Sequence, residues 1–226
     1  MTLKLYYHPL SSFCHKALIA LYESDVSFEP VFVNLGDEAS AAPLRALWPI
    51  GKFPVLRDET RGHTVAEATV IIEYIDSLLS GETRLLPPDP AVGWQARMWD
   101  RFFDLYIHMQ VQKIVGDALR PADARDPAGV AQAKAQVALG YDMIEREMSG
   151  KTWWMGDEYG LVDCAASPAL FYANTIMAIE PKRVSLSGYF NRLMARPSYA
   201  RVLKEAQPYF NMFPLEPKPQ LPKEVA

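Results

Sequence analysis

The sequence contains few cysteines, with only Cys14 and Cys164 in 226 residues. Two cysteines cannot build the disulfide framework that stabilises small secreted domains, so we expect a reducing cytoplasm. The sequence also has no apolar run long enough to cross a membrane, and its first residues, MTLKLYY, lack the apolar segment of a signal peptide. We therefore predict a cytoplasmic protein that does not enter a membrane.

Positive charge is not concentrated in any part of the chain. Residues 1–80 carry 6 Lys and Arg against 10 Asp and Glu, and the remainder carries 17 of each. A nucleic-acid-binding surface needs clustered basic side chains to contact phosphates. With a net charge of −4, the sequence argues against nucleic acid as a partner.

The sequence also lacks a recognisable set of metal ligands. His8, Cys14 and His15 lie close together, but no fourth ligand follows at a known spacing. Cys14 is a poor candidate for a reactive thiol, because it lies one turn into a predicted helix where cysteines are commonly buried. We predict no metal site and no cysteine nucleophile.

The first eighty residues alternate short β-like runs with helical patterns. Half of all residues are hydrophobic and 22% are charged, as in globular proteins with an ample core. Their order, β-α-β-α-β-β-α, predicts one sheet of mixed direction with helices packed on it. We expect strands at residues 3–7, 28–35, 53–58 and 63–68, and helices at 12–24, 37–47 and 68–80.

The chain changes character after a proline-rich stretch, RLLPPDPAV, which cannot continue a helix and is read as a linker. Beyond it, apolar residues recur every three or four positions, as on one face of a helix. We expect helices at residues 94–115, 128–148, 162–176 and 187–206. The tail from Pro214 holds four prolines and is predicted to be extended or disordered.

The stretch SSFCHK, residues 11–16, has the layout of a thioredoxin-type C-x-x-C site with Ser11 in place of the first cysteine. A hydroxyl at this point most often caps the helix. With the helix dipole it can also stabilise a thiolate and lower a thiol pKa from about 8.5. Because serine forms no disulfide, such a thiol would belong to a bound molecule. Ser11 is the first candidate for this role, and Ser12 is the alternative.

This serine, the β-α-β-α-β-β-α unit and the helical remainder resemble the cytosolic glutathione S-transferases of the serine type, with a theta-, zeta- or tau-like N-terminal motif. The resemblance runs from Leu3 to about Pro214. It implies a thioredoxin-like glutathione-binding domain at residues 1–82, a linker at 83–91 and an all-helical substrate-binding domain at 92–226. It further implies a homodimer that uses glutathione as co-substrate and needs no metal.

The resemblance also implies where glutathione would bind: Lys52, Phe53, Pro54, Glu67 and Ala68. The Phe53–Pro54 bond is expected to be cis, which would leave the Phe53 backbone free to pair with a peptide, and Lys52 would meet the glycine carboxylate. The family places a serine or threonine after its acidic residue, but here Ala68 follows Glu67. The lost hydrogen bond predicts affinity weaker by about ten-fold or more, with Thr69 a candidate for partial compensation.

The second substrate is expected between the two domains, against the helix that follows the linker. Candidate pocket residues are Tyr7, Leu10, Tyr106, Met109, Gln110 and Lys113, although such a stripe is more often core. Asp100 and Asp104 are expected either to help bind the γ-glutamyl amine or to pair with Arg97 and Arg101. Gly160 and Asp163 match a family helix cap, S/T-x-x-D, except that glycine replaces the hydroxyl residue.

The expected activity is that of a glutathione transferase of alkyl and aryl groups, which conjugates glutathione thiolate to small hydrophobic electrophiles in detoxification. Two alternatives stay open. One is a non-catalytic protein that binds glutathione or another ligand on the same fold. The other is a glutathione-dependent isomerase, dehalogenase or reductase; the zeta-type isomerases carry a cysteine directly after two serines, where this chain has Phe13.

Overall fold

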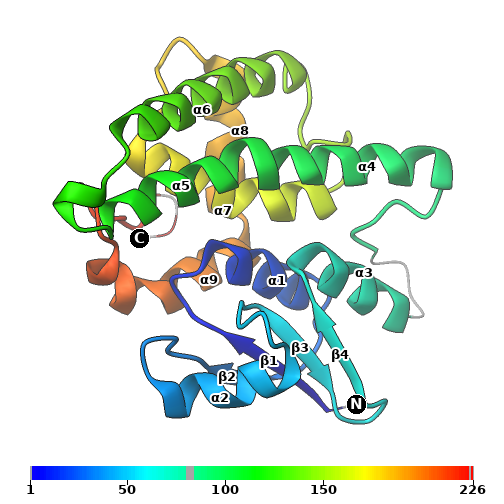
Figure 1. The fold of residues 1–226 in the computed structure, drawn as a ribbon. Coiled ribbons are helices and arrows are strands. Elements are labelled where there is room, and N and C mark those ends of the chain that lie inside the picture. Colours follow the sequence, from blue (N-terminus) through cyan, green and yellow to red (C-terminus); the bar gives the residue numbers. More distant parts are fainter. Residues whose placement is uncertain (1, 80–83, 224, 226) are drawn as a thin grey trace.

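The computed structural model describes residues 2–79, 84–223 and 225. The first part of the chain, from β1 to α3, forms a four-stranded mixed sheet with helices on both faces, and we call it the α/β part (Figure 1). Its order is the predicted β-α-β-α-β-β-α, which confirms the thioredoxin-like fold class. The elements are β1 (Leu3–Tyr7), α1 (Ser12–Glu23), β2 (Glu29–Phe32), α2 (Glu38–Leu47), β3 (Val55–Asp58), β4 (His63–Ala66) and α3 (Ala68–Leu78).

The sheet has the strand order β2-β1-β3-β4, with β1 parallel to β2 and antiparallel to β3. Successive side chains of a strand point to opposite faces of the sheet, so the core is divided between these two faces. Leu3 and Leu5 of β1 pack with α1 and α3, whereas Val33, Leu44 and Val55 form a smaller cluster on the α2 face. Helix α1 is buried along most of its length, because the helices after α3 cover its other side (Figure 1).

The second part of the chain, from α4 to η3, contains helices and we call it the helical part. Its α7 packs against α1, and α9 packs there too, so the two parts share one core cluster. None of the helices in the described residues is both long and apolar enough to span a membrane. The elements are α4 (Pro90–Phe102), η1 (Phe103–His108), α5 (Met109–Ala118), η2 (Ala122–Ala124), α6 (Pro127–Glu147), α7 (Leu161–Ile176), α8 (Val184–Ala195), α9 (Pro197–Ala206) and η3 (Gln207–Met212).

The long helix expected at residues 94–115 was predicted wrongly in two respects. It begins earlier, at Pro90 inside the expected linker, because the Asp89 carboxylate accepts a hydrogen bond from the Ala91 N–H and proline suits the first turn. It is also interrupted, since residues 103–108 form the π-helical segment η1. Such π-helical turns shift the register of the side chains that follow and occur often at functional sites.

The C-terminal end of the chain also differs from expectation. The single helix expected at 187–206 is two helices, because α9 restarts at Pro197 after an extended Arg196. The described residues of the proline-rich tail contain no helix. The tail is nevertheless not free in solvent, because Pro219 and Val225 are buried.

The start of α7 explains why glycine replaces the expected hydroxyl residue. A Cβ atom on Gly160 would lie 2.9 Å from the carbonyl oxygen of Leu85, which accepts the Leu161 N–H at 2.8 Å. The other half of the cap is present, since the Asp163 carboxylate accepts from the Gly160 N–H at 3.0 Å. Asp163 also accepts from the Trp154 N–H and the Tyr189 hydroxyl, and burial raises the pKa of its carboxyl to about 6.

Candidate functional site

A cavity of about 220 Å³ opens where the α/β part meets the helical part. Five residues expected from the sequence line it together: Lys52, Phe53, Pro54, Glu67 and Ala68. The other lining residues are Phe13, Trp48, Thr69, Arg101, Asp104, Leu105 and Met109. The cavity therefore combines charged side chains of both signs with an apolar wall.

The floor of the cavity is built by two neighbouring loops of the sheet. Val55 of β3 pairs with Ala66 of β4, so the residues just before β3 and just after β4 lie side by side. The Phe53–Pro54 peptide bond is cis, as expected. Glu67 caps α3 with a φ of +68°, a left-handed conformation that costs a non-glycine residue energy and is often kept at functional sites.

Ala68 is the first residue of α3 and is buried at the cavity. Its methyl side chain supplies no hydrogen-bond donor, but the first N–H groups of α3 have no partner within the helix. The positive end of the helix dipole adds to their attraction for an anion. A carboxylate can therefore bind at this point even though the hydroxyl is absent.

The two adjacent serines have different surroundings. Ser11 caps α1, is partly exposed, and its hydroxyl oxygen accepts from the Cys14 N–H at 3.4 Å. A hydroxyl that accepts one bond keeps its own proton for a further acceptor. Ser12 is 2% exposed and turns toward the helical part, where its oxygen contacts His108 Nε2 and accepts from the Gln112 amide at 3.2 Å.

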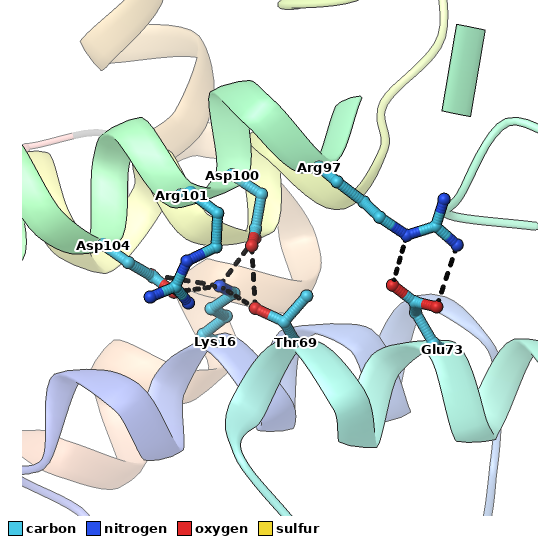
Figure 2. A network of polar contacts seen from close by, with 7 residues as sticks. All are labelled: Lys16, Thr69, Glu73, Arg97, Asp100, Arg101 and Asp104. Carbon is cyan, nitrogen blue, oxygen red and sulfur yellow. Dashed lines mark hydrogen bonds and ion pairs between the residues drawn. The ribbon is translucent and has the colours of Figure 1, made fainter. Parts of the chain in front are cut away.

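A buried ion cluster lies beside the cavity and joins the two parts of the protein (Figure 2). The Lys16 ammonium of α1 lies 2.6 Å from Asp100 Oδ1 and 2.9 Å from Asp104 Oδ2. Thr69 at the start of α3 accepts from Lys16 at 2.8 Å and donates to Asp100 Oδ2 at 2.7 Å. Burial raises the pKa of the Asp100 carboxyl, despite the attraction of Lys16.

The arginines of α4 pair differently from the expectation. Arg97 does not contact Asp100 but makes two hydrogen bonds with Glu73 of α3, at 2.8 and 2.9 Å. Arg101 pairs with Asp104 as expected, through one hydrogen bond of 3.2 Å. Since Asp100 and Asp104 have Lys16 as their main counter-charge, both acids belong to the junction between the two parts.

The residues expected to bind a second substrate are not gathered in one place. Met109 lines the cavity, next to Leu105 and Phe13. Tyr7 lines a separate hollow, together with Tyr22, Arg201 and Glu205. The Leu10 carbonyl accepts from the Tyr172 hydroxyl, and Tyr106, Gln110 and Lys113 lie on η1 and α5 outside the cavity lining.

Sequence reasoning missed Phe13, Trp48 and Leu105 as cavity residues. Phe13 follows the two serines directly, and Leu105 lies one helical turn before Met109, so both positions carried a local signal. Strand alternation also placed Tyr7 on the same face as Leu3 and Leu5, toward α1. Trp48, at the end of α2, is brought to the cavity by tertiary packing alone.

The remaining candidates for chemistry are inert in this structure. Cys14 is fully buried, and burial raises the pKa of its thiol to about 12, so it carries no thiolate at neutral pH. Among the described residues, no three His, Cys, Asp or Glu side chains are grouped so that they could hold a metal ion.

Comparison with known proteins adds to this geometry. The family model "Glutathione S-transferase, N-terminal domain" matches residues 1–77, and "Glutathione S-transferase, C-terminal domain" matches residues 104–197. Among curated proteins, Glutathione S-transferase U22 of Arabidopsis thaliana is 30% identical over 203 residues, which are 87% of this chain and 88% of the relative.

Two solved structures have the same fold. A glutathione S-transferase from Methylobacillus flagellatus with glutathione bound superposes with a TM-score of 0.81 at 23% identity, over 88% of this chain and 98% of that one. A glutathione S-transferase from Methylobacterium radiotolerans in complex with glutathione sulfonate gives 0.78 at 27% identity, over 89% and 94% of the two chains. On these matches and its fold, the chain belongs to the glutathione S-transferase family.

Proposed function

We propose that this protein binds glutathione in the cavity and conjugates its thiolate to a small hydrophobic electrophile. The observation that carries the proposal is the meeting of the loop at Phe53, the start of α3 at Glu67 and Ala68, and the apolar wall in one cavity. A peptide can pair with a loop backbone as an added strand, and a helix start can bind its carboxylate. The N-terminal turn of α1 adjoins this arrangement through Phe13.

In this proposal each end of glutathione has its own partners. The Lys52 ammonium binds the glycine carboxylate, and the Phe53 backbone pairs with the cysteinyl unit. The Glu67 carboxylate binds the γ-glutamyl ammonium, and the free N–H groups at the start of α3 bind the carboxylate beside it. The tripeptide is thus fixed at both ends, which holds its sulfur toward the β1–α1 turn.

Ser11 is the proposed donor to the sulfur. Its oxygen accepts from the Cys14 N–H, so its proton remains available, and it stands at the positive end of α1. Stabilising the thiolate lowers the thiol pKa, which raises the fraction of nucleophile at neutral pH. The electrophile lies against Phe13, Leu105 and Met109, and the rate comes from positioning and the lowered pKa.

The test is the thiol pKa of bound glutathione, followed by the ultraviolet absorbance of the thiolate against pH. The wild-type protein is expected to lower it from about 8.5 to about 6–7. Ser11→Ala is expected to return the pKa toward the free value, whereas Ser12→Ala, which removes a hydroxyl buried against His108, leaves it lowered. Glutathione that binds with an unshifted thiol would exclude the transferase mechanism.

Ala68 favours a second candidate function, a binding protein that does not activate the thiol, because the missing hydroxyl weakens the γ-glutamyl site. The same pKa measurement separates the two candidates, since only a transferase needs the shift. A glutathione-dependent isomerase or reductase would share the lowered pKa. It is separated by assaying conjugation of aryl halides beside isomerisation and disulfide reduction.

We further propose a cytoplasmic homodimer. Support comes from apolar side chains exposed on α3 and α4, namely Val70, Trp94 and Met98, of which Trp94 is 58% exposed. Exposed aromatic and methionine side chains on neighbouring helices are enriched at protein interfaces. Sedimentation at micromolar concentration tests this, and a mass near 25.4 kDa, that of one chain, would exclude the dimer.

A further inference from the structure

If glutathione binds as proposed, its γ-glutamyl carboxylate needs a partner that replaces the missing hydroxyl. Thr69, the hydroxyl nearest to Ala68 in sequence, is not available. Its oxygen accepts from the Lys16 ammonium at 2.8 Å, and its proton is donated to Asp100 Oδ2 at 2.7 Å. Turning this side chain to a ligand would break both bonds inside the buried cluster, so Thr69 cannot compensate for Ala68.

Arg101 is the charged side chain of the helical part that reaches the same cavity with donors to spare. Its guanidinium has five N–H donors, and in the described part of the chain it makes one side-chain hydrogen bond, 3.2 Å to Asp104 Oδ2. About half of the side chain is exposed. Figure 2 shows it reaching from α4 to Asp104, beside the Lys16 ammonium.

Arg97 lies one turn earlier on the same helix and, unlike Arg101, is paired with a carboxylate through two hydrogen bonds. It makes two hydrogen bonds with the Glu73 carboxylate, at 2.8 and 2.9 Å, and it does not line the cavity. Arginine and carboxylate prefer this two-bond geometry. Arg101 has the same side chain at a cavity, yet lacks such a partner in the described residues.

Asp104 occupies only a small part of the Arg101 guanidinium. Both oxygens of Asp104 accept from Lys16, at 3.0 and 2.9 Å, and Oδ2 is shared with Arg101 at 3.2 Å. The guanidinium therefore keeps N–H donors for a further anion. Glu67 in the same lining offers a carboxylate to an ammonium group. This part of the cavity suits a group that carries a carboxylate and an ammonium together.

We propose that Arg101 binds the α-carboxylate of the γ-glutamyl group and so replaces the hydroxyl that Ala68 lacks. The inference rests on the proposed function and adds a binding residue from α4 to the α/β part's site. It makes the cavity selective for ligands that end in an α-amino acid zwitterion.

The test compares two ligands by calorimetry: glutathione and γ-aminobutyryl-cysteinyl-glycine, which lacks only the α-carboxylate. The wild-type protein is expected to bind glutathione tighter by about ten-fold or more, the value of a hydrogen bond to a charged group. Arg101→Met should weaken glutathione binding by this factor and leave the analogue unchanged. Arg97→Met, the matched control on the same helix, should keep the wild-type preference.

A rescue variant separates binding from folding. Ala68→Ser restores the hydroxyl, so in the Arg101→Met background it is expected to recover much of the preference for glutathione. If Arg101→Met weakens both ligands equally, or neither, the inference is overturned while the proposed function stands. If the wild-type protein binds no glutathione, the proposed function and this inference both fail.

Discussion

His108 Nε2 contacts the hydroxyl of Ser12, 96 residues earlier in the chain, inside the junction between α1 and η1. Both residues are buried, and the Phe13 ring stacks on the His108 ring with centroids 3.9 Å apart. Gln112 donates to the same serine oxygen at 3.2 Å. The turn that carries Ser11 is thus held from the helical part, one residue away from the proposed sulfur donor.

Removing this hydroxyl tests how much the junction depends on it. Ser12→Ala is expected to lower the free energy of unfolding by about 1–3 kcal/mol, because His108 loses its partner in a buried site. Urea unfolding measures the loss, and Ser77→Ala on exposed α3 surface should change stability by less than about 0.5 kcal/mol. Equal effects of the two variants would contradict a structural role for the Ser12 hydroxyl.

The buried histidines predict that stability falls in acid. Burial lowers the pKa of His15 to about 4 and that of His108 to about 3, whereas an unfolded histidine titrates near 6.5. The unfolded state therefore binds up to two more protons below pH 6.5, and stability is full above this pH and lost as pH falls. Each extra proton corresponds to a slope of about 1.4 kcal/mol per pH unit.

Asp163 opposes part of this loss. Burial raises the pKa of its carboxyl to about 6, whereas an unfolded aspartate titrates near 3.9, so below pH 6 the folded state binds one proton that the unfolded state does not. Burial also raises the pKa of the Asp100 and Asp76 carboxyls, so we expect a net slope of about one proton or less between about pH 6 and 4.5. Urea unfolding across this range gives the slope.

A histidine variant tests whether the loss of stability in acid comes from a particular buried histidine. His15→Gln should remove about one proton from the slope. An unaltered slope in His15→Gln would mean that this side chain is already protonated in the folded state.

The order of strands and helices in the α/β part was predictable because each element carries its own pattern. Leu3 and Leu5 alternate in β1, and the breaks around Gly51 and at Gly62 lie on either side of β3, the first strand of the hairpin. The interruption of the long helix at η1 was not predictable from the sequence. Apolar residues at every third or fourth position fit α-helical and π-helical turns alike. In η1, Asp104 and His108 face α1, and this orientation depends on their packing against Lys16 and Ser12.

The candidate site was predictable only in its loops. Phe53, Pro54, Glu67 and Ala68 lie on two short segments with a local signature, and the structure brings them together. The hydrogen bonds of Thr69 could not be predicted from the sequence, because their partners, Lys16 and Asp100, lie far from Thr69 along the chain. The pairing of Arg97 with Glu73 instead of Asp100 likewise joins residues that are 24 apart in sequence, on α4 and α3.

Lys16 is the central cation of the buried cluster, so its removal is expected to be costly. Lys16→Met leaves Asp100 and Asp104 buried without their counter-charge, and should lower the free energy of unfolding by about 3–5 kcal/mol. Lys4→Met is the matched control, because Lys4 pairs with Glu29 and Glu59 at the surface. Losing these surface ion pairs should lower the free energy of unfolding by about 1 kcal/mol or less.

Neutralising the two acids tests whether unpaired charge causes the loss. Adding Asp100→Asn and Asp104→Asn to Lys16→Met is expected to recover part of the stability, since amides cost less to bury than carboxylates. If the triple variant is less stable than Lys16→Met alone, packing of the lysine side chain would be the larger contribution.

Gly160 gives a prediction in which restoring the family's usual residue does harm. Gly160→Ser supplies the hydroxyl of the helix cap, but its Cβ would lie 2.9 Å from the Leu85 carbonyl oxygen. That carbonyl is backbone and is held by the Leu161 N–H, so it cannot move without breaking this bond. We expect Gly160→Ser to destabilise by about 1–3 kcal/mol, the usual cost of overpacking.

Gly116 is the matched control for this change. It lies inside α5, and a Cβ added there meets no atom within 4 Å, so Gly116→Ala should stabilise the protein by about 0.5–1 kcal/mol through helix propensity. Thermal and urea unfolding of the two variants should therefore move in opposite directions. A stabilising Gly160→Ser would show that the Leu85 segment yields, and the glycine would then be a chance departure from the family's cap instead of a requirement of this packing.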